Sequence, residues 1–497
     1  MNEKFVLLWN GEIFHSNLKQ IQDLLDSDLN DGESLFRALN ASTSQDTAAI
    51  FDIFSSLCGP FAFVLLCREF DKVIFGRDRF GRRSLIAQSY KSFDKIPLIS
   101  LSSTVLPQNF QYIEVPSTGI FLATSNDTGL VVETFIPWSE PSIARNKSSN
   151  PPFSTLDPLS LIHTFPSSIS FNPSLNPVEQ FYEVLFKAVR VRLQKASHSC
   201  KNCLKFSKDC SHSRFCLLFS GGLDSAILAA LIDKILPISE PIDLLNVAFD
   251  HFSGGKGCCA ADSPDRITGI SCLQQLERIS PSRSWNFVKI NITNETVEKI
   301  KASGPPHSYL LKPGADTILD ESLGLAVWFA ARGRGLLNGQ DYESPAKIVF
   351  TGIGADEQLG GYSRHRMKFG TGADSQALQN ELDIDLERIG DRNLSRDDRM
   401  ISDHGREGRF PFLDENLVSF LRSVPLTQKM DLTLPQGQGD KRLLRLVADQ
   451  FLNLGHSTCD STTIPAAWQP KRAMQFGSRI AKVKSLNTGN LKGHDRF

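Results

Sequence analysis

The sequence predicts an α/β protein, in which a parallel sheet covered by helices follows a β-rich α+β part. Four short apolar runs typical of buried strands, at 215–219, 244–249, 285–290 and 348–351, are separated by helical segments such as 323–331. Alternation of this kind indicates a parallel sheet covered on both faces. Residues 1–135 read as short strands and turns, and the chain beyond Asp383 reads as mainly helical.

The 497 residues are enough for two or three domains. We place a first domain at 1–136 and a linker at 137–175, which is rich in Pro, Ser and Asn and lacks periodicity. A helical pattern begins at Pro177 and leads into the first strand of the second domain, at 176–497.

The composition is ordinary for a globular protein, with 41% hydrophobic residues and a net charge of −1. We therefore expect neither a nucleic acid nor an anionic membrane as partner. No apolar run has the length of a membrane span, and the first residues lack a signal-peptide pattern. The ten cysteines do not form a secreted disulfide framework, so we expect a cytoplasmic protein; its oligomeric state stays open.

A glycine turn joins the first apolar run to a helix, with the sequence Ser220-Gly221-Gly222-Leu223-Asp224-Ser225. A strand, a glycine turn and a helix N-terminus together direct backbone N–H groups at an anion. The serines add donors, and Asp224 can hold a metal ion on phosphates. The Gly-Lys-Ser/Thr ending of the Walker loop is missing, and the pattern is that of the PP-loop, which binds the pyrophosphate of ATP. The alternative is a chance Ser/Gly turn before a core helix.

A second turn, at 351–362, follows another strand and carries Asp356 among its glycines. The carboxyl ends of parallel strands meet at one edge of a sheet, where ligands bind in open α/β folds. We therefore expect the two turns to close over one nucleotide.

These runs resemble the motifs of the glutamine-dependent asparagine synthetases. The resemblance extends over nearly the whole chain and in the same order, through the runs 9–14, 30–33, 59–63, 76–81, 220–225, 351–362, 406–414 and 470–476. It implies a truncated, Ntn-type glutaminase-like domain at 1–136. It also implies a PP-loop ATP pyrophosphatase domain, of the adenine nucleotide α-hydrolase-like fold, with a helical C-terminal part.

The activity that the resemblance implies is a two-site amidotransferase. One site hydrolyses glutamine to ammonia; the other adenylates a carboxylate, aspartate by family default, with Mg²⁺ and ATP. The resemblance also carries over site residues in five groups. Pyrophosphate would be bound by Ser220, Gly221, Gly222, Leu223, Asp224 and Ser225, and Mg²⁺ by Asp224 and Asp356. Adenosine or the α-phosphate would be contacted by Leu218, Val247, Thr351 and Gly352, and positive charge would come from Lys471, Arg396 and Arg409. A remnant of the glutamine site would consist of Asn10, Gly11, Glu12 and Asp31. For each basic residue alone, a surface ion pair is the alternative.

The sequence departs from the family pattern at three places. Met1 is followed by Asn2, where the family has the cysteine nucleophile of the glutaminase, so we expect this chain not to hydrolyse glutamine. Ile353 stands where the family has a glutamate that handles a proton of ammonia, and Leu319 replaces an arginine. Two alternatives therefore stay open: a nucleotide-binding pseudoenzyme that acts through protein partners, and an amide ligase for a different acid.

Cysteines also gather just before the first strand of the second domain. Cys200, Cys203 and Cys210 are ligand types suited to zinc, and His198, His212 or Cys216 is available as a fourth ligand. The spacing matches no standard zinc ribbon. The sequence therefore favours a solvated loop with unpaired thiols, with a structural zinc as the alternative.

Overall fold

The structure is a computed structural model of the whole chain. It describes residues 4–27, 29–41, 47–68, 71–91, 97–105, 111–126, 129–138, 145–146, 169–196, 200–203, 210–253, 256–303, 310–311, 317–370, 374–456 and 464–482. The chain forms two compact units. Unit 1 consists of Met1–Ser168, Lys312–Gly314 and Ile384–Arg399; unit 2 consists of Ile169–Leu311, Ala315–Asp383 and Met400–Phe497.

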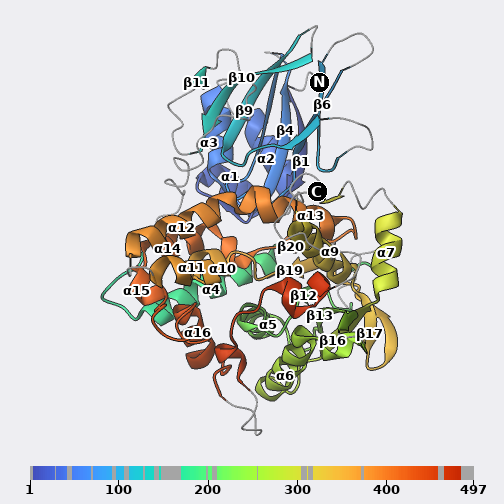
Figure 1. Ribbon diagram of the computed structural model, residues 1–497. Helices are drawn as coiled ribbons and strands as arrows, with labels where there is room; N and C mark the ends of the chain where they lie inside the picture. The colour runs from blue at the N-terminus through green and yellow to red at the C-terminus, as the bar shows by residue number, and fades with distance from the viewer. Residues whose placement is uncertain are drawn as a thin grey trace. The chain divides into compact units, whose positions relative to one another are not determined.

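Unit 1 is built on an antiparallel sheet (Figure 1). Its strand order is β1 (Phe5–Gly11), β4 (Phe61–Cys67), β5 (Lys72–Arg77), β9 (Gly119–Asn126), β10 (Gly129–Pro137) and β11 (Arg145–Asn146). Two smaller sheets are β7 (Pro97–Ser102) with β6 (Ile86–Lys91) and β8 (Gln111–Glu114), and β2 (His15–Ser16) with β3 (Leu57–Cys58). Alternate residues of β4 serve two cores, Phe61, Phe63 and Leu65 on one face and Ala62 on the other.

The strand-only reading of this part of the sequence is wrong, because unit 1 also contains α1 (Lys19–Leu25), α2 (Asp31–Ala41) and α3 (Thr47–Ser55). In α3, Ile50, Phe51, Ile53 and Phe54 are buried at helical spacing against the core on the Phe61 face. The predicted linker is only partly described. Its β11 pairs with β10, and 147–168 lies outside the described residues.

Unit 2 contains a mostly parallel sheet, and the four predicted strands are all present in it. The strand order is β18 (Gln340–Glu343), β17 (Arg334–Leu337), β16 (Trp285–Ile292), β13 (Ile242–Phe249), β12 (Phe215–Leu218), β19 (Ile348–Phe350) and β20 (Glu407–Arg409). From β16 to β20 the pairing is parallel. β17 and β18 form an antiparallel hairpin whose turn is Asn338-Gly339, both with positive φ, as a two-residue type I′ turn requires.

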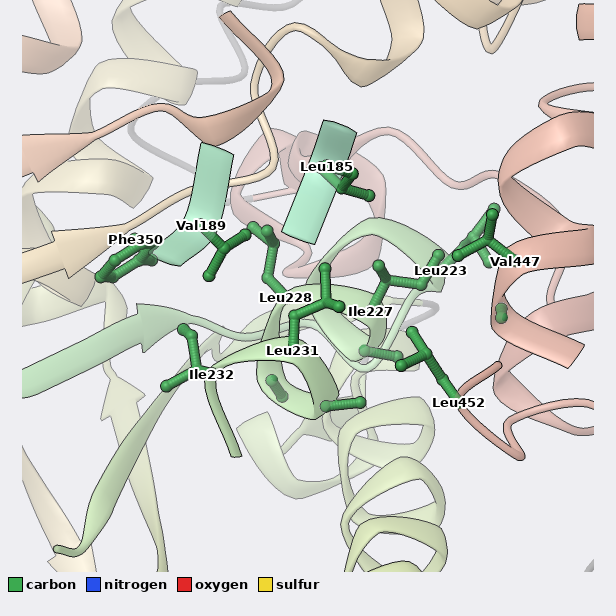
Figure 2. Packing of buried hydrophobic residues seen from close by; sticks show 14 of the residues in the cluster. Leu185, Val189, Leu223, Ile227, Leu228, Leu231, Ile232, Phe350, Val447 and Leu452 are labelled. Atoms are coloured by element: carbon green, nitrogen blue, oxygen red, sulfur yellow. The ribbon is translucent and has the colours of Figure 1, made fainter. Parts of the chain in front are cut away.

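Helices cover both faces of this sheet (Figure 1). On one face lie α4 (Pro177–Gln194), α5 (Leu223–Ile235), α6 (Pro264–Ile279), α14 (Glu415–Ser423) and α16 (Arg442–Gln450). On the other lie α7 (Asn294–Ala302) and α9 (Ile318–Arg332). Figure 2 shows Leu223, Ile227 and Leu228 of α5 packed among side chains from α4 and α16. The doubly covered sheet is the α/β architecture that the sequence predicts.

The described elements of the C-terminal part are mainly helical, as expected. They are α10 (Ala355–Leu359), α11 (Ser363–Gly370), α12 (Ser375–Ile389), α13 (Ser395–Ser402), α15 (Leu426–Lys429), α17 (Met474–Gly477) and the short helices η3 (Gly390–Leu394), η4 (Pro411–Leu413), η5 (Ala466–Trp468) and η6 (Ile480–Lys482). Unit 2 also has β14 (His251–Ser253), β15 (Lys256–Cys258) and η2 (Ala260–Asp262). Within the described residues, no helix is both long and apolar enough to cross a membrane.

Candidate functional site

The first glycine turn leads from β12 into α5. Gly221 has φ +76°, and a Cβ there would lie 2.5 Å from the carbonyl oxygen of Thr268, so only glycine fits. Gly222 caps α5; its N–H donates to Ser220 Oγ at 3.3 Å, and its carbonyl accepts from Ser225 Oγ at 3.0 Å. The turn thus holds the backbone against α6 and sets the N-terminus of α5 beside the end of β12.

The second glycine turn leads from β19 into α10 and touches the first. A Cβ at Gly352 would lie 2.8 Å from Asp224 Cβ, so the absence of a side chain at 352 lets the turns approach. Gly354 has φ +99° and begins α10, and its N–H donates to Glu357 Oε2 at 3.1 Å. The two turns that the sequence singled out therefore lie together at the carboxyl edge of adjacent parallel strands.

Four charged side chains meet where these turns touch. Lys441 Nζ lies 2.8 and 2.7 Å from the two carboxylate oxygens of Asp224 and 2.6 Å from Asp356 Oδ1. Lys471 Nζ donates to the other oxygen of Asp356. We call Asp224, Asp356, Lys441 and Lys471 the carboxylate–lysine cluster. Three of its members were predicted from the sequence, and the structure brings them together.

The electrostatics of the cluster follow from this pairing. Burial by itself would raise the pKa of Asp356, but the ammonium groups of Lys441 and Lys471 outweigh burial and lower it. Burial would lower the pKa of Lys471, but the carboxylates of Asp356 and Asp224 outweigh it and raise that pKa. Asp356 and Lys471 are therefore both charged at neutral pH.

Lys441 is the member of the cluster that the sequence reading missed. It stands at the N-cap of α16 with φ +51°, and its side chain is 2% exposed. A lysine there is unfavourable twice over, because the helix dipole repels cations at this end and a left-handed φ strains a residue with a Cβ. A residue that breaks local rules in this way is a signal of a functional position, but both the N-cap position and the φ are known only from the structure.

A second layer of polar groups supports Asp356. Tyr362 donates its hydroxyl to Glu357 Oε1 at 2.6 Å, and burial together with the Asp356 charge raises the pKa of Glu357. A Cβ at Gly361 would collide with Asp356 Oδ1 and Lys441 Cε, so glycine is needed for the lysine to reach the carboxylate. The glycines of the second turn therefore shape the cluster as well as the backbone.

The remaining predicted nucleotide contacts lie at the same edge of the sheet. Leu218 ends β12 and is half-buried, whereas Val247 in β13 and Thr351 after β19 are buried. Ile353 is half-buried, and its N–H donates to Thr351 Oγ1 at 3.2 Å. Leu319, in the first turn of α9, is also half-buried.

The two predicted arginines have other measured partners. Arg396 belongs to unit 1, where its Nη2 lies 2.8 Å from Asp397 Oδ1. Arg409 is buried in β20, and its Nε lies 2.8 Å from Glu407 Oε1. The role of either arginine at a phosphate or a carboxylate stays a prediction.

One more carboxyl group borders the cluster. Asp265, in the first turn of α6, is 8% exposed, and a Cβ at Gly477 would overlap its carboxylate. Burial raises the pKa of Asp265 to about 7, against the opposing charges of Arg472 and Lys471. The pKa of Asp265 is therefore raised, whereas that of Asp356 is lowered.

The predicted remnant of a glutamine site lies in unit 1. Asp31 Oδ2 accepts from the N–H of Ile13 at 2.8 Å, which ties α2 to the end of the 10–12 run. A Cβ at Gly11 would overlap Pro60, and the N–H of Glu12 donates to the Pro60 carbonyl at 2.9 Å. Asn10 is exposed. The structure thus brings Asp31 beside this run.

Two cysteines of unit 1 lie in its strands. Cys58 in β3 and Cys67 in β4 are both buried, and burial raises the pKa of the Cys67 thiol to about 11. A thiol so hard to ionise is a poor nucleophile. Both residues are part of the buried core.

Comparison with known proteins places these features in a family. The Asparagine synthase family model matches residues 368–453. The human asparagine synthetase domain-containing protein 1 is 38% identical, covering 97% of this chain and 85% of that protein. An asparagine synthetase domain-containing protein of Drosophila melanogaster is 31% identical over 97% of this chain and 86% of its own.

The class defined by the sheet, the two turns and the matched model is that of the asparagine synthase-like proteins. Within this class, the chain belongs to the family of asparagine synthetase domain-containing protein 1. A glutamine-hydrolyzing asparagine synthetase of Gallus gallus is more distant, at 24% identity over 97% of this chain and 74% of its own. The resemblance found in the motifs is thereby confirmed.

Proposed function

We propose that unit 2 binds Mg-ATP at the two glycine turns and uses it to adenylate a carboxylic acid, which ammonia then converts to an amide. Aspartate is the first acid to test, because the chain is related to asparagine synthetases. The observation that carries the proposal is the carboxylate–lysine cluster, formed where two glycine turns touch at the carboxyl edge of parallel strands.

The residues of the site fit a magnesium–pyrophosphate group. Carboxylate oxygens are the ligands that Mg²⁺ takes, and Asp224 and Asp356 would hold the ion, which would neutralise charge on the phosphates. The cradle is lined by glycines 221, 352 and 361, at each of which a Cβ would meet protein atoms. Lysines suit this role because an ammonium group is a compact point charge on a flexible stem, able to turn from a carboxylate to a phosphate.

The reaction proposed is a nucleophilic substitution at phosphorus. A carboxylate oxygen attacks the α-phosphorus, the bond to the β-phosphate oxygen breaks, and pyrophosphate leaves. Lys441 and Lys471, which both pair with Asp356, would stabilise the charge that develops on the leaving group. Ammonia then attacks the acyl carbon, AMP leaves, and the nitrogen loses a proton.

A pseudoenzyme that binds nucleotide without this chemistry is the second candidate. Ile353 favours it, because this half-buried side chain sits inside the second turn and has no group that can accept a proton. Leu319 favours it too, since it brings no charge to α9.

ATP–pyrophosphate exchange is the test that separates the candidates. The purified full chain is incubated with Mg²⁺, ATP and labelled pyrophosphate, with aspartate and a panel of other carboxylic acids in turn. We expect exchange that depends on one acid and is lost in Asp224→Ala. Binding of ATP without exchange by any acid would overturn the adenylation proposal and leave the pseudoenzyme.

Amide formation is then measured separately, with ammonia supplied directly. Exchange without amide formation would locate the defect at the second step, where Ile353 replaces the family's glutamate. Restoring that glutamate in Ile353→Glu would then be expected to raise the amidation rate without changing exchange.

A further inference from the structure

Three cysteines that precede β12, Cys200, Cys203 and Cys210, lie close together in the structure. The sulfur atoms of Cys200, Cys203 and Cys210 and Nδ1 of His212 all lie within 4.8 Å of one another. Cys203 Sγ and Cys210 Sγ are 3.5 Å apart, and Cys210 Sγ and Cys200 Sγ are 3.6 Å apart. The three cysteines form no disulfide, but separate thiols in a solvated loop do not account for this convergence.

The histidine completes a compact tetrahedron. Nδ1 of His212 lies 3.6 Å from the sulfur of each of the three cysteines. For a regular tetrahedral zinc site with Zn–S of about 2.3 Å and Zn–N of about 2.0–2.1 Å, the S···S edges are about 3.8 Å and the S···N edges about 3.6 Å. The measured edges agree with that geometry to within a few tenths of an ångström.

We infer that Cys200, Cys203, Cys210 and His212 bind one zinc ion in a closed structural site. The ligand set is three sulfurs and one imidazole nitrogen, which is typical of structural zinc. A disulfide does not explain the cluster, because its sulfurs would lie about 2.05 Å apart. Binding would convert three thiols to thiolates with release of three protons and no change of oxidation state.

The other candidates for the fourth ligand are not supported. Cys216 is fully buried in β12, where its sulfur donates to the carbonyl of Ile348 at 3.4 Å. His198 lies outside the described residues. Since all four corners of the tetrahedron are protein atoms, no position is left open for water or substrate, and the site has a structural rather than a catalytic form.

The position of the cluster shows what the zinc would hold in place. On one side the N–H of Lys201 donates to the Pro345 carbonyl at 2.8 Å, just before β19. On the other, Ser213 Oγ donates to the Phe215 carbonyl at 2.7 Å, at the start of β12. The ion would thus secure the amino-terminal ends of the two strands whose opposite ends carry the glycine turns. It would also close the chain between α4 and β12.

Metal content is the first measurement. The full chain, purified from zinc-supplemented cells without chelator, is analysed by mass spectrometry for metals. We expect about one zinc per chain, lost in Cys203→Ser and in Cys210→Ser, whose parent side chains are half-buried and so tolerate serine. The control is Cys259→Ser, which removes an exposed cysteine outside the cluster and is expected to keep the zinc.

A second measurement uses only the unaltered chain and does not depend on whether a variant folds. Zinc is removed with a chelator, and Co²⁺ is added; we expect the visible absorption of tetrahedral cobalt with thiolate ligands. The thermal midpoint is expected to fall on chelation and to return with zinc. Three results would each overturn the inference. The first is a chain that is free of metal and whose three cluster thiols react freely. The second is iron or copper in place of zinc, and the third is an unchanged zinc content in both serine variants.

Discussion

Each unit contains a buried network of charged side chains, and the two networks use different basic residues, arginine in unit 1 and lysine in unit 2. In unit 1, Arg77, Arg83 and Arg399 bind carboxylates and backbone carbonyls around Glu114 and Asp398. In unit 2, Lys441 and Lys471 bind two aspartates between glycine turns. Both networks are largely buried, and a glycine borders each of them, Gly81 beside Arg77 and Gly361 beside Asp356, but only the second carries its positive charge on flexible lysine stems.

The unit 1 network is closed by fixed partners. Arg77 donates to the carbonyls of Arg83 at 2.7 Å and Val115 at 2.9 Å, to the Gly81 carbonyl, and to Ser395 Oγ at 2.5 Å. Arginine's planar fork suits such rigid pairing, which fastens the 384–399 segment to the first strands of the chain. The comparison teaches that buried charge alone does not mark a site. The unit 2 cluster differs from the unit 1 network in carrying its positive charge on flexible lysine stems.

The largest expected effect is in the closed network. Arg77→Met would remove the Arg77 donor from three buried carbonyls and its charge from beside Glu114. We expect unit 1 to lose about 3–5 kcal/mol of its free energy of unfolding. Urea unfolding of the full chain, followed by circular dichroism, measures the loss, with each unit treated as its own transition.

The matched control for Arg77 is Arg37→Met, which breaks an exposed pair with Glu33 (side chains 55% and 43% exposed). We expect a change below about 0.5 kcal/mol there. Equal effects in the two variants would contradict the view that the unit 1 network is structural.

The next largest effect concerns two carboxyl groups of unit 2, Asp356 and Asp265, whose pKa values are shifted in opposite directions. The pKa of Asp265 is raised to about 7, above the value of about 3.9 in the unfolded chain. Between these values the folded chain binds more protons than the unfolded chain, so the stability contribution is full at low pH and falls as pH rises. We expect it to fall by up to about 1.4 kcal/mol per pH unit.

Asp265→Asn removes this titration. The stability of the variant relative to the parent is therefore expected to increase from pH 4 to pH 7, as measured by urea unfolding at each pH. Asp262→Asn, at an exposed aspartate nearby, is the control and should leave the profile unchanged. If the stabilities of Asp265→Asn and the parent changed in parallel from pH 4 to pH 7, Asp265 would be ionised throughout this range. Asp356 acts in the opposite sense, because its lowered pKa gives stability that is lost as pH falls through the acid range.

The sequence predicted local signals well and long-range ones poorly. The strands at 215–219 and 348–351 and their glycine turns were found because apolar runs and turn residues are adjacent in the chain. The pairing of Arg77 with Ser395 joins residues 318 positions apart, which no local pattern reveals. The same holds for Lys441, whose partner Asp224 is 217 positions away. The cysteine spacing gave the ligand types, but only the fold gave their convergence with His212.

Lys441→Met tests whether the unit 2 network binds phosphate. We expect the affinity for Mg-ATP to fall by about 10- to 100-fold, the loss of one strong charged contact of about 1.5–3 kcal/mol. Isothermal titration calorimetry measures the affinity, and circular dichroism checks the fold. Lys429→Met is the control, because Lys429 is a lysine of the same unit whose exposed fraction, 3%, is close to the 2% of Lys441. Unaltered affinity in Lys441→Met would make the cluster a second closed network.

The smallest expected effect comes from adding one methyl group at the contact of the two turns. In Gly352→Ala the new Cβ would lie 2.8 Å from Asp224 Cβ, so Asp224 must shift. We expect a cost of about 1–2 kcal/mol in stability and a several-fold loss of Mg-ATP affinity. Gly370→Ala, at the end of α11, is the control, since no atom lies within 4 Å of its new Cβ. Because Gly352→Ala changes no charge, a loss of affinity in this variant alone would tie nucleotide binding to the shape of the cradle. If Gly352→Ala and Gly370→Ala bound Mg-ATP with equal affinity, the lysines would bind the nucleotide independently of the shape of the cradle.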